Sequence, residues 1–227
     1  MSEPGRFASS PCLACEIAPE CFDPLALDPE QTRDVDRWRK AERARLLADR
    51  KALSVSQRRA AADRTAAQLD TLMAARFQNV DGLTISAWWP IKAELDQRCW
   101  LESLLARGAR VSLPVVMAPA APMAFRLWTP DCKMMQGVWK IPVPAVGPEA
   151  EPDLTLAPVV GWNPAGFRLG YGGGYFDRTQ ALLSPRPMTI GVGLQSARLA
   201  TILPQPHDIA LDVILTEAGV QFEGECE

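Results

Sequence analysis

The stretch LTISAWWPIKAELDQRCWLESLLARGARVSLPV, residues 83–115, decides the fold. It opens with a β-branched and aromatic run, Leu83–Trp89, which has the length of a buried strand and stops at Pro90. A helix pattern follows and ends at Gly108, after which a second strand is predicted over Arg110–Val115. Strand, helix and strand in this order predict one compact βαβ unit, and its two strands should pair in parallel.

Two helices are predicted before this unit. Residues 32–53 contain no proline or glycine and consist mostly of good helix formers. Ser54 and Gln57 then form a Ser-x-x-Gln capping box, which predicts a second helix from Val55 to residue 77. The two helices should therefore meet at a corner near Leu53.

Shorter elements are predicted after the βαβ unit. Strands are expected at Ala124–Trp128, Asp153–Val160, Met188–Val192 and Leu211–Thr216, with a helix around Phe176–Leu183. The segment IPVPAVGPEAEPD, residues 141–153, is interpreted as a proline-broken connection over the surface. No internal repeat is present. The sequence therefore predicts an α/β fold, a three-layer α/β/α sandwich with a mostly parallel central sheet.

The composition is that of an ordinary globular protein. The chain has 227 residues, 48% hydrophobic and 22% charged, and a net charge of -3, so it has no overall attraction to nucleic acid or to an anionic membrane. Residues 1–32 hold five prolines without periodicity, which predicts an irregular N-terminal extension before a single domain over residues 33–227. No membrane-spanning run and no secretion signal are recognised, so a cytoplasmic location is expected.

The six cysteines are scattered, which favours reduced thiols over a disulfide framework. Cys12, Cys15 and Cys21 have a spacing that could begin a metal site. No fourth cysteine or histidine lies nearby, and His207 is the only histidine of the chain. An exposed tail is therefore the favoured interpretation of this cluster.

The stretch RLGYGGGYFDR, residues 168–178, carries the strongest functional signal. A strand, a glycine-rich loop and a helix start follow one another here, which gathers backbone N–H groups around a site suited to phosphate. The loop lacks the lysine of a P-loop, and Tyr175 stands where the dinucleotide fingerprint needs glycine. A tight turn that only needs unusual backbone angles remains the alternative.

Two charged neighbours favour a nucleotide at this loop. Arg168 can bind phosphate oxygens, and Asp177 can hold Mg²⁺, which prefers carboxylate and phosphate oxygens together. For Asp177 the alternative is a carboxylate that stabilises a helix N-terminus.

Over about residues 37–218 the chain resembles the 5-formyltetrahydrofolate cyclo-ligases, also called methenyltetrahydrofolate synthetases. The segment GFRLGYGGGYFDR is similar to that family's signature Gly-x-Arg-Leu-Gly-x-Gly-x-Gly-Tyr-Tyr-Asp. Three other segments resemble the family in the same order: RKAERARLLADRKALS, ISAWWPIKAELD and IGVGLQSARLATILPQPHDIALDVILTE.

The resemblance implies an ATP- and Mg²⁺-dependent conversion of 5-formyltetrahydrofolate to 5,10-methenyltetrahydrofolate, with release of ADP and phosphate. It implies reduced folate and ATP as small-molecule partners, with no nucleic acid or membrane, and a monomer or weak homodimer. Nucleotide-binding residues would be Arg39, Lys40, Arg43, Arg168, Leu169, Gly170, Tyr171, Gly172, Gly173, Gly174, Tyr175 and Phe176. Substrate-binding residues would be Trp89, Glu94, Tyr171, Gly172, Gly173, Gly174 and Tyr175. Arg168 and Tyr175 would be catalytic, and Asp177 and Asp208 would bind Mg²⁺.

Without the resemblance, several of these residues have plainer interpretations. Arg39 and Arg43 would be a solvated helix face, and Trp88 and Trp89 would belong to the core. His207 is favoured as a loop residue that orients Asp208, with a general acid as the alternative.

The chain also departs from the family pattern. Arg39 stands where the family generally has lysine, Trp162-Asn163 where it has Phe-Asp, and Phe176 where it has tyrosine. These changes leave two alternatives open: a folate- or nucleotide-binding paralogue without turnover, and an ATP-dependent enzyme that acts on a different substrate.

Overall fold

The structure, a computed structural model, describes residues 29–224, so the cysteine cluster at residues 12–21 lies outside the described residues. Two compact units divide the chain, residues 1–37 and residues 38–227. The described part of the first unit is the beginning of α1 (Pro29–Ala52), where Arg37 pairs with Asp34 one turn earlier. The second unit begins at Trp38, a few residues later than the domain boundary that the sequence predicts.

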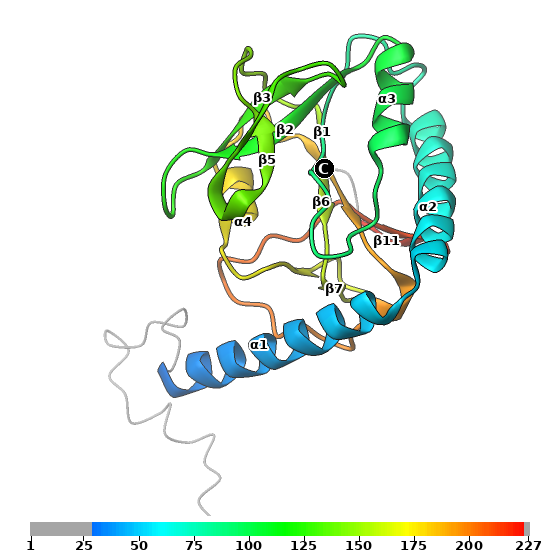
Figure 1. The fold of residues 1–227 in the computed structure, drawn as a ribbon. Helices are drawn as coiled ribbons and strands as arrows, with labels where there is room; N and C mark the ends of the chain where they lie inside the picture. The colour runs from blue at the N-terminus through cyan, green and yellow to red at the C-terminus, as the bar shows by residue number, and fades with distance from the viewer. Residues whose placement is uncertain (1–28, 225–227) are drawn as a thin grey trace, which may run out of the picture. The chain divides into compact units, whose positions relative to one another are not determined.

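A seven-stranded mixed sheet forms the centre of the second unit (Figure 1). The strand order is β11-β10-β9-β6-β1-β2-β3, and the five strands from β10 to β2 are parallel to one another. Only the two edge strands, β11 and β3, pair antiparallel. The bounds are β1 Thr84–Ser86, β2 Arg110–Val116, β3 Met123–Trp128, β6 Leu154–Pro158, β9 Met188–Val192, β10 Val213–Thr216 and β11 Gly219–Glu223. The prediction of an α/β fold with a mostly parallel sheet is confirmed.

Helices cover the sheet on both sides (Figure 1). On one side α2 (Val55–Arg76) packs against β10 and β11, and α3 (Arg98–Ala106) packs against β2. On the other side the short α4 (Tyr175–Gln180) packs against β3. From Trp38 onward, α1 runs past the carboxyl ends of the parallel strands, where Leu46 contacts the chain beyond β6.

Local sequence signals explain most of these boundaries. The Ser54 hydroxyl accepts the Gln57 amide at 3.2 Å, and the Gln57 side chain accepts the Ser54 amide at 2.8 Å, so the predicted capping box is formed. The predicted βαβ unit is confirmed, because β1 and β2 pair in parallel around α3. Strand β1 is shorter than predicted, since the chain leaves the sheet after Ala87.

Other predicted boundaries were wrong by a few residues or missed an element. Helix α1 begins at Pro29 rather than near residue 32, because proline at the first helical position loses no hydrogen bond. The connection predicted over residues 141–153 contains strand β5 (Pro142–Pro144), which pairs with β4 (Met134–Gln136). Proline fits there because a two-stranded ribbon leaves each strand with an unpaired edge.

A second hairpin was also missed. Strands β7 (Gly161–Trp162) and β8 (Arg168–Leu169) pair antiparallel, and the glycine loop begins directly after β8. Trp162 is only 1% exposed and donates its indole N–H to the Leu194 carbonyl at 2.9 Å. The hairpin is therefore anchored in the core and holds the start of the loop in place.

No helix within residues 29–224 combines the length and the apolar character needed to cross a lipid bilayer.

Candidate active site

The glycine loop between β8 and α4 has the backbone geometry that its sequence requires. Gly172 and Gly174 adopt φ angles of 92° and 62°, which favour glycine. A Cβ atom on Gly172 would lie 3.3 Å from the Arg43 guanidinium carbon, and one on Gly173 would lie 2.8 Å from the Tyr175 ring. Side chains are therefore absent because Arg43 and Tyr175 occupy the space around this backbone.

The amides of the loop are open. Among the described residues, the backbone N–H groups of residues 170–174 donate to no backbone carbonyl. Arg43 on α1 donates from Nε to the Gly170 carbonyl at 2.7 Å, which fixes the beginning of the loop from the opposite side. A row of available amides beside arginine side chains is suited to an anion.

Arg168 is buried beneath this loop. Its Nη2 lies 3.3 Å from Asp177 Oδ2, and its guanidinium lies over the Phe176 ring at 4.3 Å. Burial lowers the pKa of Arg168, and the charges of Asp177 and Asp208 act in the opposite direction. Its Nε is buried without a partner in the described part of the chain. The two carboxylates predicted to bind metal thus lie near the same cation.

Arg39 does not lie on a solvated helix face, which is the interpretation that the sequence favours without the family resemblance. It is 6% exposed, and its Nε and Nη2 donate to the carbonyls of Ile202 and Leu203, each at 2.9 Å. The same guanidinium forms a two-pronged ion pair with Asp208, which also accepts the Gln205 amide at 2.7 Å.

The ion pair of Arg39 sets the charge state of Asp208. Burial alone would raise the pKa of Asp208, but the Arg39 hydrogen bonds and the Gln205 amide hold it below its usual value. His207 is exposed, with its Nε2 3.9 Å from the same carboxylate. Arg39 therefore holds the loop that carries Asp208 in place. That Arg39 also binds phosphate stays a prediction. Lys40 is exposed and lies off the helix face shared by Arg39 and Arg43.

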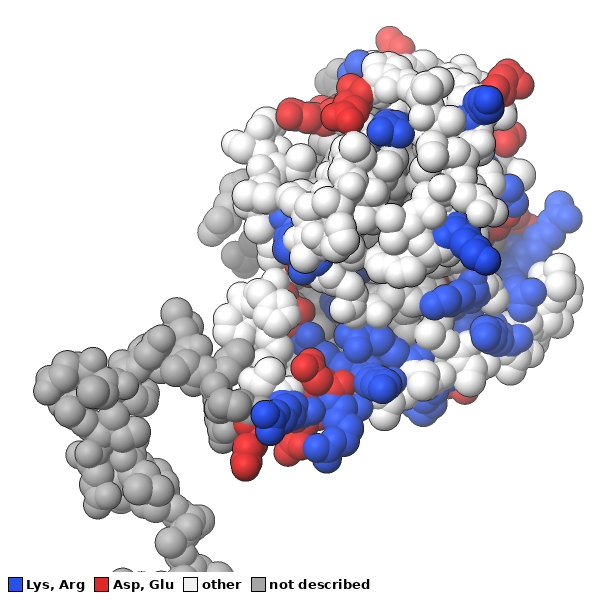
Figure 2. Space-filling view, turned by 60° about the vertical axis from the view of Figure 1, so that its left-hand side comes forward, with Lys and Arg blue, Asp and Glu red and all other residues white. Residues whose placement is uncertain are grey.

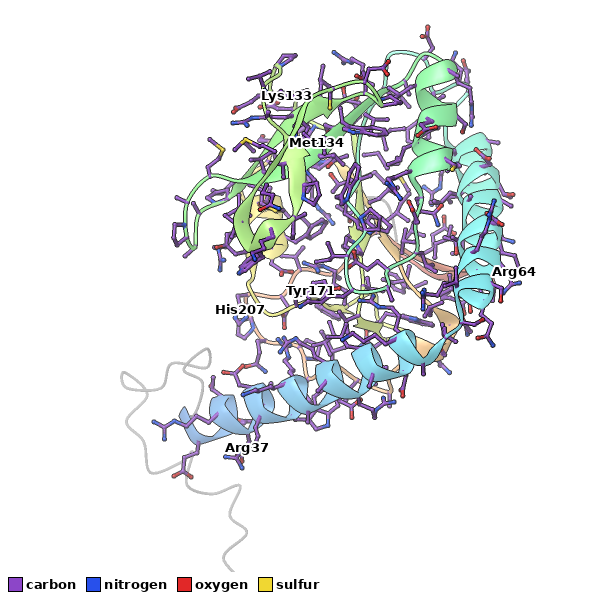
Figure 3. The ribbon with its side chains drawn as sticks, viewed as in Figure 1. Arg37, Arg64, Lys133, Met134, Tyr171 and His207 are labelled. Carbon is purple, nitrogen blue, oxygen red and sulfur yellow. The ribbon has the colours of Figure 1, made fainter. Side chains whose placement is uncertain are left out.

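Glu94 lies on the other side of the loop, in a hydrogen-bonded chain. Its Oε1 accepts the Tyr171 hydroxyl at 2.9 Å and its Oε2 accepts the Ile91 amide at 2.9 Å. Tyr171 in turn accepts a hydrogen bond from Arg50 Nη2 at 2.7 Å. Figure 3 places Tyr171 between the sheet and α1, where it connects the glycine loop to both partners.

An apolar pocket opens beside Glu94 and Tyr171. Aromatic side chains form much of its wall: Trp88, Trp89, Trp139, Tyr171 and Tyr175. Trp89 packs edge-on against Trp128 with ring centres 6.4 Å apart, and Trp139 packs edge-on against Tyr175 at 5.4 Å. The core interpretation holds for Trp88, which is 8% exposed, whereas Trp89 is only partly buried. Flat aromatic walls beside a carboxylate suit a planar ring that carries N–H donors.

Sequence reasoning missed Trp139 and Arg50. Trp139 is 64% exposed at a turn between β4 and β5, and a large exposed aromatic in a proline-rich segment was the available signal. Arg50 follows Arg43 by seven residues and therefore shares its helix face, which periodicity could have indicated.

Asn163, where the family pattern has a carboxylate, holds a turn. Its side-chain oxygen accepts the amides of Ala165 at 3.2 Å and Phe167 at 3.0 Å. The residue is 5% exposed and lies between β7 and β8. An amide serves this turn as well as a carboxylate does, because both offer the acceptor that the two N–H groups need.

The site lies where an open α/β sheet usually binds ligands. Glu94 follows β1 and Val159 follows β6, and the chain changes direction between these two strands, since β2 and β6 flank β1 on opposite sides. Although the net charge is -3, lysine and arginine side chains gather on the face shown in Figure 2. Fold and site together define an α/β protein with a glycine loop suited to an anion beside an aromatic pocket.

Comparison with known proteins identifies the family. Residues 35–217 match the 5-formyltetrahydrofolate cyclo-ligase family, to which this chain belongs. A 5-formyltetrahydrofolate cyclo-ligase of Mycolicibacterium smegmatis is 32% identical over 145 residues, which are 60% of this chain and 75% of that protein. The Haemophilus influenzae protein of the same name is 29% identical over 138 residues, 58% of this chain and 74% of its own length.

Solved structures agree with the fold. The NMR structure of Aquifex aeolicus 5,10-methenyltetrahydrofolate synthetase superposes with a TM-score of 0.68 at 23% identity, covering 83% of this chain and 94% of the other. The 5,10-methenyltetrahydrofolate synthetase of Mycoplasma pneumoniae gives a TM-score of 0.64 at 24% identity, covering 79% and 98%.

Proposed function

We propose that this chain catalyses the ATP-dependent conversion of 5-formyltetrahydrofolate to 5,10-methenyltetrahydrofolate, with release of ADP and phosphate. The observation that carries the proposal is the shared position of two features: the open amides of residues 170–174, and the pocket lined by Glu94. Tyr171 and Tyr175 belong to the loop and also line the pocket. A phosphate on the loop and a folate in the pocket would therefore meet.

The phosphate side would work through charge and alignment. ATP supplies the phosphoryl group that turns the formyl oxygen into a leaving group. The amides of residues 170–174 and the side chains of Arg43 and Arg168 would hold the phosphate oxygens, so charge that develops there meets donors already in place. Leu169 and Phe176 would act by holding the ends of this loop.

Mg²⁺ is part of the proposal, with Asp177 and Asp208 as its candidate ligands. Both carboxylates act on Arg168, and hard oxygen ligands of this kind suit Mg²⁺ when phosphate oxygens and water complete its shell. Within residues 29–224 no group of three or more His, Cys, Asp and Glu side chains forms a metal cage. Such a site fits a cation that arrives with the nucleotide rather than a tightly held structural ion.

The folate side would recognise the ring system. Glu94 offers carboxylate oxygens to the N–H groups of a pterin, and Trp89, Trp139 and Tyr175 offer aromatic surfaces. Tyr175 Oη is 3.4 Å from the Ala120 amide, and its ring contacts Trp139 and the Arg178 guanidinium. We assign Tyr175 to stacking on the folate ring or polarising it.

The test is an absorbance assay for the methenyl product, with ATP, Mg²⁺ and 5-formyltetrahydrofolate. Wild-type protein should form product, whereas Asp177→Ala and Asp177→Asn should fold and lose activity by about 10²-fold or more, as for loss of a group that stabilises transition-state charge. Asp131→Ala removes an exposed carboxylate and serves as the control. A folded wild-type protein that forms no product would refute the function, and an active Asp177→Ala would remove Asp177 from the metal site.

The same assay separates the two alternatives. A binding paralogue would take up ATP or folate in calorimetry without forming ADP, and an enzyme with another substrate would hydrolyse ATP regardless of 5-formyltetrahydrofolate. We also propose that the enzyme works in the cytoplasm as a monomer or weak homodimer, which analytical ultracentrifugation over a range of concentrations would test.

A further inference from the structure

Arg50 connects α1 to the folate side of the site. It is 8% exposed, and its Nη2 donates to the Tyr171 hydroxyl at 2.7 Å. A guanidinium can only donate, so the Tyr171 oxygen accepts from Arg50 and its proton points to Glu94 Oε1, 2.9 Å away. Both hydrogen bonds therefore donate in the same direction: Arg50 on α1 donates to Tyr171 in the glycine loop, and Tyr171 donates to the Glu94 carboxylate.

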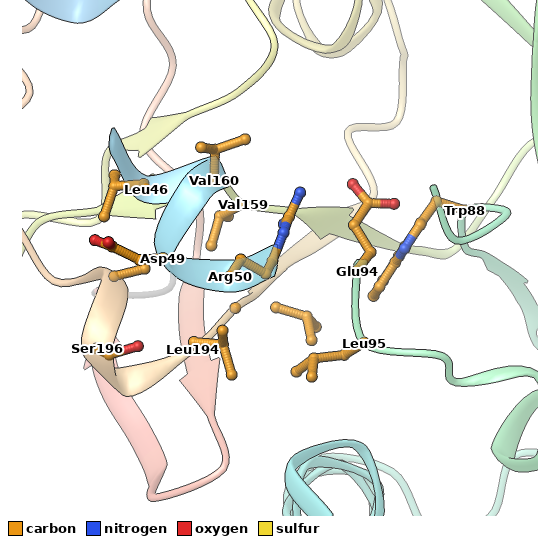
Figure 4. A pocket seen from close by; sticks show the side chains of 13 residues that line it. Leu46, Asp49, Arg50, Trp88, Glu94, Leu95, Val159, Val160, Leu194 and Ser196 are labelled. Atoms are coloured by element: carbon orange, nitrogen blue, oxygen red, sulfur yellow. The ribbon is translucent and has the colours of Figure 1, made fainter. Parts of the chain in front are cut away.

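The charge of Arg50 acts on Glu94. Burial raises the pKa of Glu94, and the Ile91 amide, the Arg50 charge, the Tyr171 hydrogen bond and the Lys92 charge act in the opposite direction. Asp49, next to Arg50 on α1, also lines this cavity, and Figure 4 shows its carboxylate on the side away from Glu94. Figure 4 shows the charged ends of Arg50 and Glu94 at the same end of that cavity. Arg50 is thus a cation on α1 that opposes the effect of burial on the pKa of this carboxylate.

The position of Arg50 is set by Tyr171. In the described part of the chain its Nε is buried without a partner, as is Nε1 of Trp88 in the same cavity. An arginine that served only to hold the fold would be expected to have its buried Nε paired. The contact between Nη2 and Tyr171 is therefore the interaction that orients the guanidinium.

We propose that Arg50 is a positioning residue for folate recognition: through the Tyr171 hydroxyl it keeps Glu94 as an acceptor that faces the aromatic pocket. Arg43, on the same helix face, holds the backbone of the glycine loop at Gly170. One helix face would then set both halves of the site, Arg43 for phosphate and Arg50 for folate. The inference rests on the proposed function.

The test compares KM values for the two substrates. In Arg50→Ala the KM for 5-formyltetrahydrofolate should rise about 10- to 100-fold, the range expected for loss of a hydrogen bond that involves one charged group, while the KM for ATP and the kcat change much less. Arg50→Lys should recover part of the loss, because it restores the charge without the fork of donors. Arg59→Ala, which removes an exposed arginine on α2, should behave like the wild type.

Two further measurements separate positioning from a structural role. Tyr171→Phe should raise the same KM, and its effect should not add to that of Arg50→Ala, because both changes break one chain of hydrogen bonds. The KM increase in Arg50→Ala should also grow toward acidic pH, since Glu94 protonates more readily without the nearby cation.

Each outcome decides the matter. If Arg50→Ala does not fold, Arg50→Lys and Tyr171→Phe carry the test. Folded variants whose folate KM equals that of the wild type, or rises only together with the ATP KM, would overturn the inference. A wild-type protein that forms no methenyl product would instead refute the proposed function.

Discussion

The glycine loop and the Glu94 network face the same pocket, but their hydrogen bonds are arranged differently. In the described structure the loop leaves the amides of residues 170–174 without backbone acceptors. Glu94, by contrast, already receives hydrogen bonds from Tyr171 and Ile91. The proposed phosphate half consists of donors that are available to a charged ligand, and the proposed folate half is an acceptor that is already hydrogen-bonded.

This difference indicates which kinds of substitution should impair each half of the site. The loop depends on backbone conformation and on space, because its groups are main-chain amides. The Glu94 half depends on charge and on side-chain hydrogen bonds. Steric changes should therefore damage ATP use most, whereas changes of charge or aromatic surface should damage folate use.

Among the variants that separate the two halves, the largest effect is expected from Gly172→Ala. Alanine would be strained at a φ of 92°, and its methyl group would press on the Arg43 guanidinium. We expect kcat/KM for ATP to fall about 10²-fold, because a small displacement of the reacting groups is enough for a loss of that size.

Gly82→Ala is the matched control for this change. Gly82 has a φ of 76° with nothing within 4 Å of the added Cβ, and it lies far from the loop in the turn before β1. It should lose some stability and keep its activity. Equal kinetic losses in the two variants would mean that backbone strain, rather than the position of the loop, causes the effect.

A smaller effect is expected from Trp139→Ala. This side chain is 64% exposed and packs against Tyr175, so its loss should leave stability unchanged and remove one wall of the pocket. The folate KM should rise about tenfold, in line with the energy of one aromatic contact, while the ATP KM stays near its wild-type value. Val146→Ala, at another exposed apolar position, is the control. An unchanged folate KM would place the ring outside the folate site.

The sequence predicted the elements whose signals are local. The Ser54–Gln57 capping box and the βαβ unit of residues 83–115 formed as expected, because each depends on neighbours within one segment. The β4–β5 hairpin was missed, because prolines indicate a loop and only the pairing of the two strands accommodates them.

The candidate site, too, was predictable only where the signal lies within one segment of the sequence. Glycine spacing located the loop that we propose binds phosphate, but the contact of Arg50 is with Tyr171, 121 residues later. Asn163 looked like a lost carboxylate, and only its contacts with the amides of Ala165 and Phe167 show that it holds a turn. Contacts between distant segments are set by the fold, so no pattern within one segment indicates them.

The smallest effect concerns stability and pH. Burial raises the pKa of Glu94 in the folded protein above its ordinary value of 4.5, so the folded state binds a proton more readily than the unfolded state. The contribution of Glu94 to the free energy of unfolding is fully present below its pKa in the unfolded state. It is lost as the pH rises through its pKa in the folded state. Glu94→Gln should therefore be more stable than the wild type at neutral pH, although we expect it to bind folate poorly.

Thermal unfolding across pH checks the sign of this effect. The advantage of Glu94→Gln should shrink toward zero at pH values below about 4, where glutamate is protonated in both states. A stability difference that does not change with pH would contradict the account of Glu94 as a buried, ionised acceptor.

The most direct test is a single-turnover experiment with enzyme in excess over 5-formyltetrahydrofolate, in the presence of ATP and Mg²⁺. If the loop and the pocket bring the phosphate and the formyl group together, methenyl product and inorganic phosphate should appear in equal amounts, and neither should appear without the other substrate. Phosphate release that does not depend on the folate, or folate binding with no methenyl product, would contradict the account.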